Sequence, residues 1–218
     1  MNAEYQRLEA AARAVQRQID DIIETRVVAS ATEHTQLERE LTQLHIRLGS
    51  LRHGLVLVRS AAAPHVRESE RRFVCALPRK FHSQGQRDQT IALRGEVTVK
   101  LRVTYYHRSR HVANVAKKSR RGMFPVLLLL GISEGLTPAV RSRMAKSAAL
   151  LGSFDEAAEM LAEEGLCVSV NRLRKVTAGM GRMLARLTSA GQLTAAGDAA
   201  ARRIVVTADG GRVRLRGN

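Results

Sequence analysis

Apolar residues in the first third of the chain recur with the spacing of a coiled coil. Seven of them lie alternately four and three residues apart, at Leu37, Leu41, Leu44, Leu48, Leu51, Leu55 and Val58. A shorter run has the same rhythm, at Leu8, Ala12, Val15, Ile19 and Ile22. This spacing places the apolar side chains on one side of a helix, in the a and d positions of a heptad repeat. The pattern therefore predicts coiled-coil helices over residues 1–63.

The two apolar runs are out of phase with each other. If the run that starts at Leu8 is continued in alternating threes and fours, it reaches position 36 and not Leu37. Between the runs, Ser30 and Glu33 have the spacing of a capping box, which starts a new helix. Two helices that fold back as a hairpin fit this pattern, and so does a broken helix that forms a homodimer. The segment is interpreted as an oligomerisation or spacer element, or as a helical pair packed on its own domain.

A regular alternation of apolar and polar residues follows in the middle of the chain. Apolar residues alternate with polar ones from Val97 to Tyr105, and the polar positions are Thr98, Lys100, Arg102 and Thr104. This period of two predicts a strand with one basic face, and the preceding TIAL segment adds a second strand. We expect a basic β-hairpin module over residues 87–122. The charged stretch 64–86, which opens with Pro64, is predicted to be a linker.

Helical signals return in the second half of the chain. Helix starts are indicated at Thr137, Ser153 and Ser169, each of which is a preferred capping residue. A glutamate three residues after Ser153 completes a second capping box, and Gly165 is placed to end that helix. A helix, a glycine-containing turn and a basic second helix form the pattern of a helix-turn-helix. We predict a helix-turn-helix region over residues 123–190.

The start of the second helix enters the major groove in a helix-turn-helix protein. Four polar residues in its first turns are therefore the candidate DNA contacts: Asn171, Arg172, Arg174 and Lys175. Arginine pairs with guanine through two hydrogen bonds, and asparagine pairs with adenine in the same way. The alternative is an ordinary polar helix face. In the turn, Leu166 and Val168 are expected to pack inward, and Cys167 is interpreted as a small buried residue.

Charge is distributed unevenly along the chain, whose formal net charge is +16. Residues 1–63 are neutral, with eight basic and eight acidic side chains, so the whole excess lies in residues 64–218. Basic surfaces bind polyanions by releasing counterions, which makes double-stranded DNA the expected partner. A basic loop after the hairpin supplies further candidate phosphate contacts, at Lys117, Lys118, Arg120 and Arg121. A solvated run of charge is the alternative for this loop.

The sequence argues against a membrane or secreted protein. Its N-terminus is polar, and the longest apolar run, MFPVLLLLGI, is about half the ~20 residues that span a bilayer. Cys75 and Cys167 are too few and too distant in sequence to suggest a disulfide framework. We therefore expect a cytoplasmic protein.

Four side chains around the β-hairpin are weak candidates for a zinc site: Cys75, His82, His107 and His111. Zinc sites are usually built from closely spaced cysteine and histidine pairs. Here the chain has no CxxC motif, and His107 and His111 have the only ligand-like spacing. We expect no metal site and interpret these histidines as surface residues.

Two segments of the chain are similar to a known family. The blocks SFDEAAEMLAEEGLCVSV and VVTADGGRVRLR, in this order after the hairpin, resemble the N-terminal half of bacterial insertion-sequence transposases of the DDE class. Their catalytic domain has a ribonuclease-H-like fold. The resemblance implies that the first block is the DNA-binding helix-turn-helix and that Asp209 is the first acid of a metal-binding triad. It covers the stretch from Arg87 to Arg216. Paired cysteines of a zinc ribbon, frequent in such transposases, are not kept here.

The resemblance also shapes the expected activity. Two-metal phosphoryl transfer needs several converging carboxylates, and only nine residues follow Asp209 in this sequence. We expect residues 191–218 to be a linker and the first strands of a truncated catalytic domain. The chain would bind transposon-end DNA without cleaving it, and Mg²⁺ is expected only in a complete family member. The alternatives are a stand-alone helix-turn-helix regulator that dimerises through its coiled coil, and a basic scaffold or RNA-associated protein.

The predicted fold class is mainly α with a small β-hairpin module. It comprises N-terminal coiled-coil helices, a helix-turn-helix and a short C-terminal β-hairpin.

Overall fold

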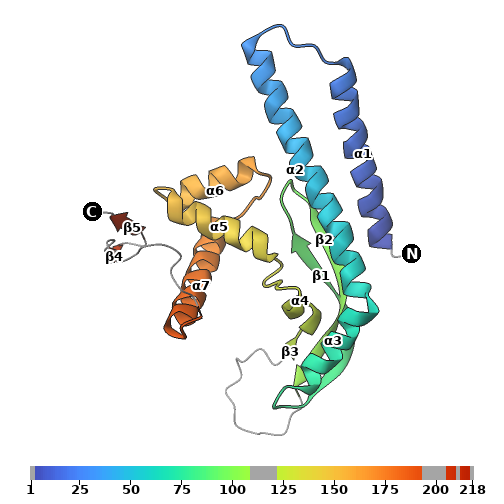
Figure 1. Ribbon diagram of the computed structural model, residues 1–218, viewed down its shortest axis with the longest axis vertical. Coiled ribbons are helices and arrows are strands. Elements are labelled where there is room, and N and C mark those ends of the chain that lie inside the picture. The colour runs from blue at the N-terminus through green and yellow to red at the C-terminus, as the bar shows by residue number, and fades with distance from the viewer. Residues whose placement is uncertain (1–2, 109–121, 193–204, 210–211, 217–218) are drawn as a thin grey trace. The chain divides into compact units, whose positions relative to one another are not determined.

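The chain is mainly α-helical and carries a small antiparallel sheet, as predicted (Figure 1). The computed structural model describes residues 3–108, 122–192, 205–209 and 212–216. The described elements are α1 (Ala3–Thr25), α2 (Ala31–Ala62), α3 (Pro64–Cys75), β1 (Phe81–Ala92), β2 (Thr98–Arg108), β3 (Gly122–Met123), α4 (Pro125–Leu129), α5 (Pro138–Leu150), α6 (Phe154–Glu163), α7 (Val170–Ser189), β4 (Val205–Asp209) and β5 (Arg212–Arg216). They divide into two compact units, the first ending at Pro138 and the second starting at Ala139.

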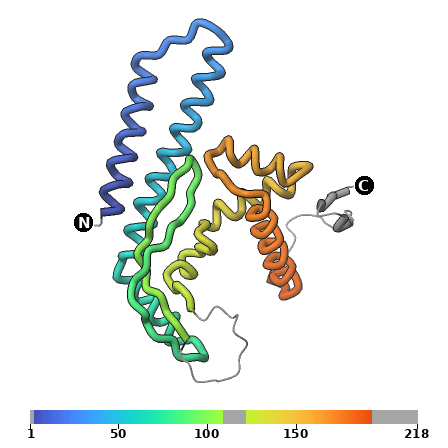
Figure 2. The backbone as a smooth tube through the Cα atoms, turned by 180° about the vertical axis from the view of Figure 1, so that it is seen from behind, coloured from blue at the N-terminus to red at the C-terminus, as the bar shows by residue number. Residues whose placement is uncertain are grey.

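Helices α1 and α2 form an antiparallel hairpin (Figure 2). The break between them lies where the capping box is predicted: the Ser30 hydroxyl accepts the Glu33 N–H at 3.2 Å. The Glu33 carboxylate in turn accepts the N–H of Ala29, the residue before the cap, at 2.8 Å, so the two bonds fix the entry of the chain into α2. The phase change between the two apolar runs thus marks a chain reversal, and each run faces the other helix.

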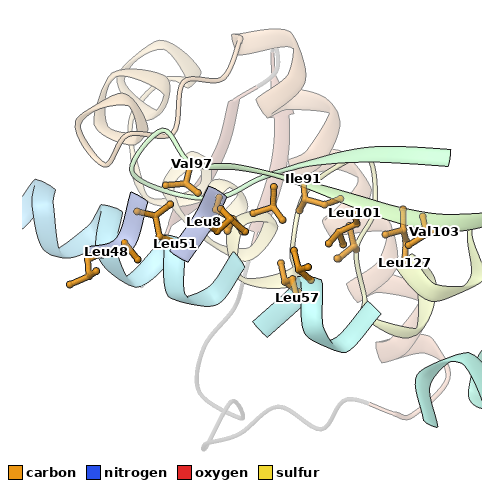
Figure 3. Packing of buried hydrophobic residues seen from close by; sticks show 14 of the residues in the cluster. Leu8, Leu48, Leu51, Leu57, Ile91, Val97, Leu101, Val103 and Leu127 are labelled. Carbon is orange, nitrogen blue, oxygen red and sulfur yellow. The ribbon is translucent and has the colours of Figure 1, made fainter. Parts of the chain in front are cut away.

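Helix α2 packs against α1 and against the sheet (Figure 3). Leu48, Leu51, Leu57 and Val58 of α2 are buried, together with Leu8, Ala12, Val15 and Ile19 of α1. The sheet contributes its apolar face through Ile91, Val99, Leu101 and Val103. Each fully buried side chain of this size stabilises the fold by about 1.5–3 kcal/mol, so the core shared by these three elements supplies much of the driving force for folding.

Gly54 of α2 lies where the three elements meet. A Cβ atom there would be 2.8 Å from the Val99 Cγ2 atom and 3.3 Å from the Leu8 Cδ1 atom. Glycine in a helix costs about 1 kcal/mol relative to alanine, yet here the missing side chain lets β2 and α1 approach the helix axis. Gly49 lies earlier on α2 and meets no such constraint, because a Cβ atom there would have no neighbour within 4 Å.

Strands β1 and β2 form the predicted hairpin and pair in antiparallel register, with Ile91 opposite Val99. Strand β3 extends the sheet only beside Tyr106 and His107. Earlier on β2, α1 supplies side chains to the backbone: the Glu4 carboxylate accepts the Lys100 N–H, and Arg7 donates to the Thr98 carbonyl, both at 2.8 Å. These two bonds occupy one acceptor and one donor on the β2 edge, where an additional strand would otherwise pair.

The Glu4–Arg7 pair is itself joined by two hydrogen bonds of 2.8 Å. The Arg7 guanidinium and the Lys100 N–H lower the pKa of the Glu4 carboxyl, although partial burial opposes them. The stability that this carboxylate contributes is therefore present at neutral pH and is lost as the pH falls through its lowered pKa.

The prediction of a linker over residues 64–86 is wrong, because this segment contains helix α3 and the start of β1. Pro64 does end α2, but it also occupies the first turn of α3, where a missing N–H costs nothing. Ala63 is the cap of both helices. The dense charges that suggested a linker lie mostly on the exposed side of α3.

Glu70 is an exception among the charged residues of α3, since it is only 5% exposed. Its Oε1 atom has no hydrogen-bond partner among the described residues. Burial raises the pKa of this carboxyl, and the positive charges of Arg67 and Arg71 oppose that shift. The protonated form of Glu70 therefore suits the folded state better than the carboxylate does.

Within the described part of the chain, none of the helices has both the length and the apolar character to cross a membrane. The apolar MFPVLLLLGI stretch instead contains the five-residue helix α4, which buries Pro125, Val126 and Leu127 in the first unit.

We expect alanine to have opposite effects at the two glycines of α2. Gly49→Ala should raise the free energy of unfolding by up to about 1 kcal/mol through helix propensity alone. Gly54→Ala forces a methyl group against Val99 and Leu8, and overpacking of this kind costs about 1–3 kcal/mol. Urea denaturation of the two variants measures the difference. Equal stabilisation by both substitutions would show that the packing around Gly54 is loose.

We expect Glu70→Gln to stabilise the protein at neutral pH but not in acid. A group with a raised folded-state pKa contributes its stability below its unfolded pKa of about 4.3 and loses it as the pH rises. Removing the charge should therefore raise the unfolding free energy by about 1 kcal/mol at pH 7.5 and have little effect near pH 4. Thermal denaturation at both pH values tests this expectation.

Glu68→Gln is the matched control for the Glu70 variant, because Glu68 is exposed and pairs with Arg72 at 3.1 Å on the same helix. It should show no gain in stability at neutral pH. A Glu70→Gln protein that is less stable than the wild type at both pH values would contradict the preference of this site for a neutral side chain.

Candidate nucleic-acid interface

Helices α5, α6 and α7 of the second unit bury apolar side chains from each helix. The buried residues are Val140 and Met144 of α5, Ala157 and Leu161 of α6, Leu166 of the turn, and Leu173 and Val176 of α7. Helices α6 and α7 pack on each other, and each has one apolar side. The buried side of α5 also includes Ser147.

The turn between α6 and α7 is fixed by local hydrogen bonds. Gly165 has a φ of +69°, in the left-handed region that favours glycine. Its N–H donates to the Ala162 carbonyl at 2.8 Å, and the Leu166 N–H donates to the Leu161 carbonyl at 2.9 Å. This pair of bonds is a Schellman motif, which closes the C-terminus of α6. The predicted glycine stop is confirmed.

Both helices of this motif begin at the predicted serine caps. The Ser153 hydroxyl accepts the Glu156 N–H at 3.1 Å, and the Ser169 hydroxyl accepts the Arg172 N–H at 3.3 Å. Glu156 also accepts the Gly152 N–H at 3.1 Å, one residue before the N-cap amide that a standard capping box uses. The start of α7 is therefore held in place by its own cap and by the turn that precedes it.

An ion pair connects α5 to the same turn. Arg143 of α5 donates hydrogen bonds from its Nε and Nη2 atoms to the carboxylate of Glu164, the residue that caps α6. The Glu164 side chain is 14% exposed, and its hydrogen bonds and charge raise the pKa of Arg143. A two-pronged arginine–carboxylate pair restricts both position and orientation, so α5 and the turn are held together.

Helix α7 carries the four predicted DNA contacts in its first turns. Asn171, Arg174 and Lys175 are exposed, and Arg172 is partly buried. The Arg174 guanidinium lies 5.4 Å from the centre of the Phe154 ring on α6, a cation–π contact that orients it. The structure thus brings the four residues to one end of one helix.

The outward face of α7 continues beyond these residues, farther than the helix-turn-helix pattern indicates. With 3.6 residues per turn, Asn171, Lys175, Arg182 and Arg186 lie within about 60° of one another around the helix axis. They form a stripe about 22 Å long on the side opposite the buried Leu173. Arg182 and Arg186 are exposed, and the spacing of 175, 182 and 186 is the signal that would have identified them. We call these four residues the α7 stripe.

Charge is segregated between the two helices of the motif. Helix α7 has five basic and no acidic side chains, whereas α6 has four acidic and no basic ones. The second half of α7 extends away from α5 and α6 (Figures 1 and 2), and nearly all of its residues from 181 onward are exposed. The motif therefore presents a basic helix and an acidic helix to solvent.

Of the other predicted residues, the basic loop is not described, and the weak zinc candidates are described only in part. Lys117, Lys118, Arg120 and Arg121 lie outside the described residues, as does His111. His82 and His107 are opposite each other on β1 and β2, and Cys75 is an exposed residue at the end of α3. No group of three potential metal ligands occurs among residues that the structure describes.

Asp209 is the last residue of β4 and pairs with Arg212 of β5, in the antiparallel hairpin that the sequence predicts.

Cys167, predicted to be buried, is exposed, because Leu166 fills the interior of the turn and the next residue points outward.

Comparison with known proteins finds no matching protein family, no similar curated sequence and no similar solved structure.

We expect the Arg143–Glu164 pair to stabilise the second unit. Arg143→Met removes both hydrogen bonds and leaves the largely buried Glu164 carboxylate with fewer donors, which should lower the unfolding free energy by about 1–3 kcal/mol. Arg141→Met, on the same helix, is the control with the same change in charge. Thermal denaturation of both variants provides the measurement. Equal losses of stability would mean that charge alone, and not this pair, is responsible.

Proposed function

We propose that this protein binds double-stranded DNA through α7, with the start of the helix in the major groove. The α7 stripe carries the proposal: three basic side chains and one asparagine share a single exposed face. An α-helix fits the major groove, and arginine and asparagine are side chains that read guanine and adenine there.

The basic side chains of α7 divide by position into two roles. Asn171 of the stripe, and Arg172 and Arg174 on its two flanks, lie next to the Ser169 cap, where the backbone is held in place. A fixed backbone limits the directions that these side chains explore, which suits them to base edges. Arg182 and Arg186 lie farther along the exposed end of the helix, where long cationic side chains suit phosphates.

The acidic helix α6 restricts how DNA approaches. In many helix-turn-helix proteins the first helix crosses the DNA backbone. Here Asp155, Glu156, Glu159 and Glu163 give α6 four negative charges, which repel phosphates. We infer that DNA lies along the outward face of α7 and that α6 faces away from the duplex.

The family resemblance suggests which DNA is bound. In the transposases that the sequence resembles, this site is the end of the mobile element, and Asp209 on β4 takes the position of the first catalytic acid. A stand-alone regulator that dimerises through its coiled coil is the alternative. That alternative needs an available apolar seam, but α1 and α2 bury Leu8, Val15, Leu48 and Leu51 within one chain. This packing argues against dimerisation through the coiled coil.

Site selection from a random duplex library, followed by binding assays at several salt concentrations, tests the proposal. We expect Arg172→Ala/Arg174→Ala to abolish the preference for the selected site, since each good base contact contributes about 1–3 kcal/mol of discrimination. Arg182→Ala/Arg186→Ala should weaken binding to all duplexes about equally. It should also make the slope of log K against log salt concentration shallower by about 0.9 for each phosphate that the protein no longer neutralises.

The two double variants remove the same charge, so each is the control for the other, and circular dichroism checks that both remain folded. Identical behaviour of the two would contradict the division of roles along α7. Binding that neither variant affects would refute the proposal that α7 contacts DNA. A selected site that is absent from the ends of the DNA element carrying the gene would leave DNA binding standing and rule out the transposon-end target.

A further inference from the structure

The α1–α2 hairpin is neutral in composition but not in its charge distribution. Residues 20–40, which form the tip of the hairpin, contain six acidic and two basic side chains. Residues 1–19 and 41–63 contain two acidic and six basic ones. Because α1 and α2 are antiparallel, the second set comes together at the base of the hairpin. The fold thus creates a positive base and a negative tip from a segment without net charge.

An open groove lies between α1 and α2 in the basic half of this hairpin. Its volume is about 700 Å³, and it is lined by Glu9, Ala12, Arg13, Gln16, Arg17, Arg52 and Leu55. Three arginines and one glutamate leave the lining with an excess of two positive charges. Ala12 and Leu55 add apolar surface beneath them. We call this depression the arginine groove.

The guanidinium groups of the arginine groove are only partly compensated. Arg13 pairs with Glu9 at 3.0 Å, and its side chain is nevertheless 73% exposed. Arg52 donates to the neutral Gln16 side chain at 3.1 Å. The Arg17 Nε atom donates to the Arg13 carbonyl at 3.4 Å, a long bond. No carboxylate within the described ranges forms an ion pair with Arg17 or Arg52, so both keep donors for an anion.

We propose that the arginine groove binds the phosphodiester backbone of duplex DNA, as a second contact that is independent of base sequence. This inference rests on the proposed function and adds a second surface to it. Arginine presents a planar fork of donors that matches phosphate oxygens, and the groove offers two such forks, one from α1 and one from α2. The small apolar floor at Ala12 and Leu55 suits the sugar carbons between the phosphates. The groove supplies no built pocket for a base, which is why the contact carries no sequence preference.

The test compares two double variants of the full chain that change charge equally. Arg17→Gln/Arg52→Gln removes the uncompensated arginines of the groove. Arg26→Gln/Arg39→Gln removes two arginines at the acidic tip, where Arg26 pairs with Glu40. Binding of both proteins to a duplex of random sequence is measured by fluorescence anisotropy over a range of salt concentrations. Thermal denaturation verifies that each variant is folded.

We expect the groove variant to bind DNA more weakly, with a salt slope shallower by about 1.8 because two fewer phosphates are neutralised. The tip variant should bind like the wild type or slightly more weakly, with an unchanged slope. Equal effects of the two variants would show that only net charge matters and would overturn the proposal. A groove variant with wild-type binding would overturn it as well, and would leave an acidic protein surface as the ligand of the groove.

The same assay separates this inference from the proposed role of α7. If neither Arg172→Ala/Arg174→Ala nor Arg182→Ala/Arg186→Ala has an effect while the groove variant does, the groove binds DNA and the α7 proposal fails. If only the α7 variant loses affinity, the α7 proposal stands and the groove proposal fails. The preference for a selected site should be unchanged in the groove variant, because phosphate contacts carry no base information.

Discussion

The first unit depends on helix α2, which packs against two partners at once. Along its second half, α2 packs against α1 on one side and against the apolar face of the β1–β2 hairpin on another. Neither partner would be stable without it, because a single helix or a two-stranded hairpin buries too little apolar surface in water. At Gly54 the helix has no side chain at all, and this absence sets how closely the three elements approach. One helix therefore joins the α1–α2 hairpin to the sheet, and α4 adds to the same core by packing against β2.

The position of the charged side chains in the fold matters more here than the net charge of each segment. The N-terminal third has no net charge, yet folding places its basic side chains at one end of the hairpin and its acidic ones at the other. The same separation occurs on a smaller scale between the acidic α6 and the basic α7. In both places a positive surface, which attracts anions, lies beside a negative surface, which repels them. Such pairs of surfaces orient a polyanion as well as attracting it.

The features that follow local rules were predictable from the sequence, and part of the candidate site is among them. The serine caps at positions 30, 153 and 169, the glycine stop at Gly165 and the alternating strand all depend on neighbours a few residues away. Helix α3 was not predictable in this way, because its charges suggest solvent and its apolar residues are few. Arg182 and Arg186 were missed because the helix-turn-helix pattern ends after two turns, whereas the exposed face of α7 does not. The arginine groove had no sequence signal: Arg17 and Arg52 are 35 positions apart, and only the chain reversal brings them together.

The bonds from Glu4 and Arg7 to strand β2 have a consequence for the order of synthesis on the ribosome. The Glu4 carboxylate and the Lys100 amide that it binds are 96 residues apart, so α1 leaves the ribosome long before its partner strand. Because α1 is already present when β2 emerges, the bonds from Glu4 and Arg7 can form before another nascent strand pairs with this edge. The first turn of α1 thus protects the edge of a strand that is made much later. A substitution that displaces this turn would therefore first increase aggregation of newly made chains, before it affects the DNA binding proposed here.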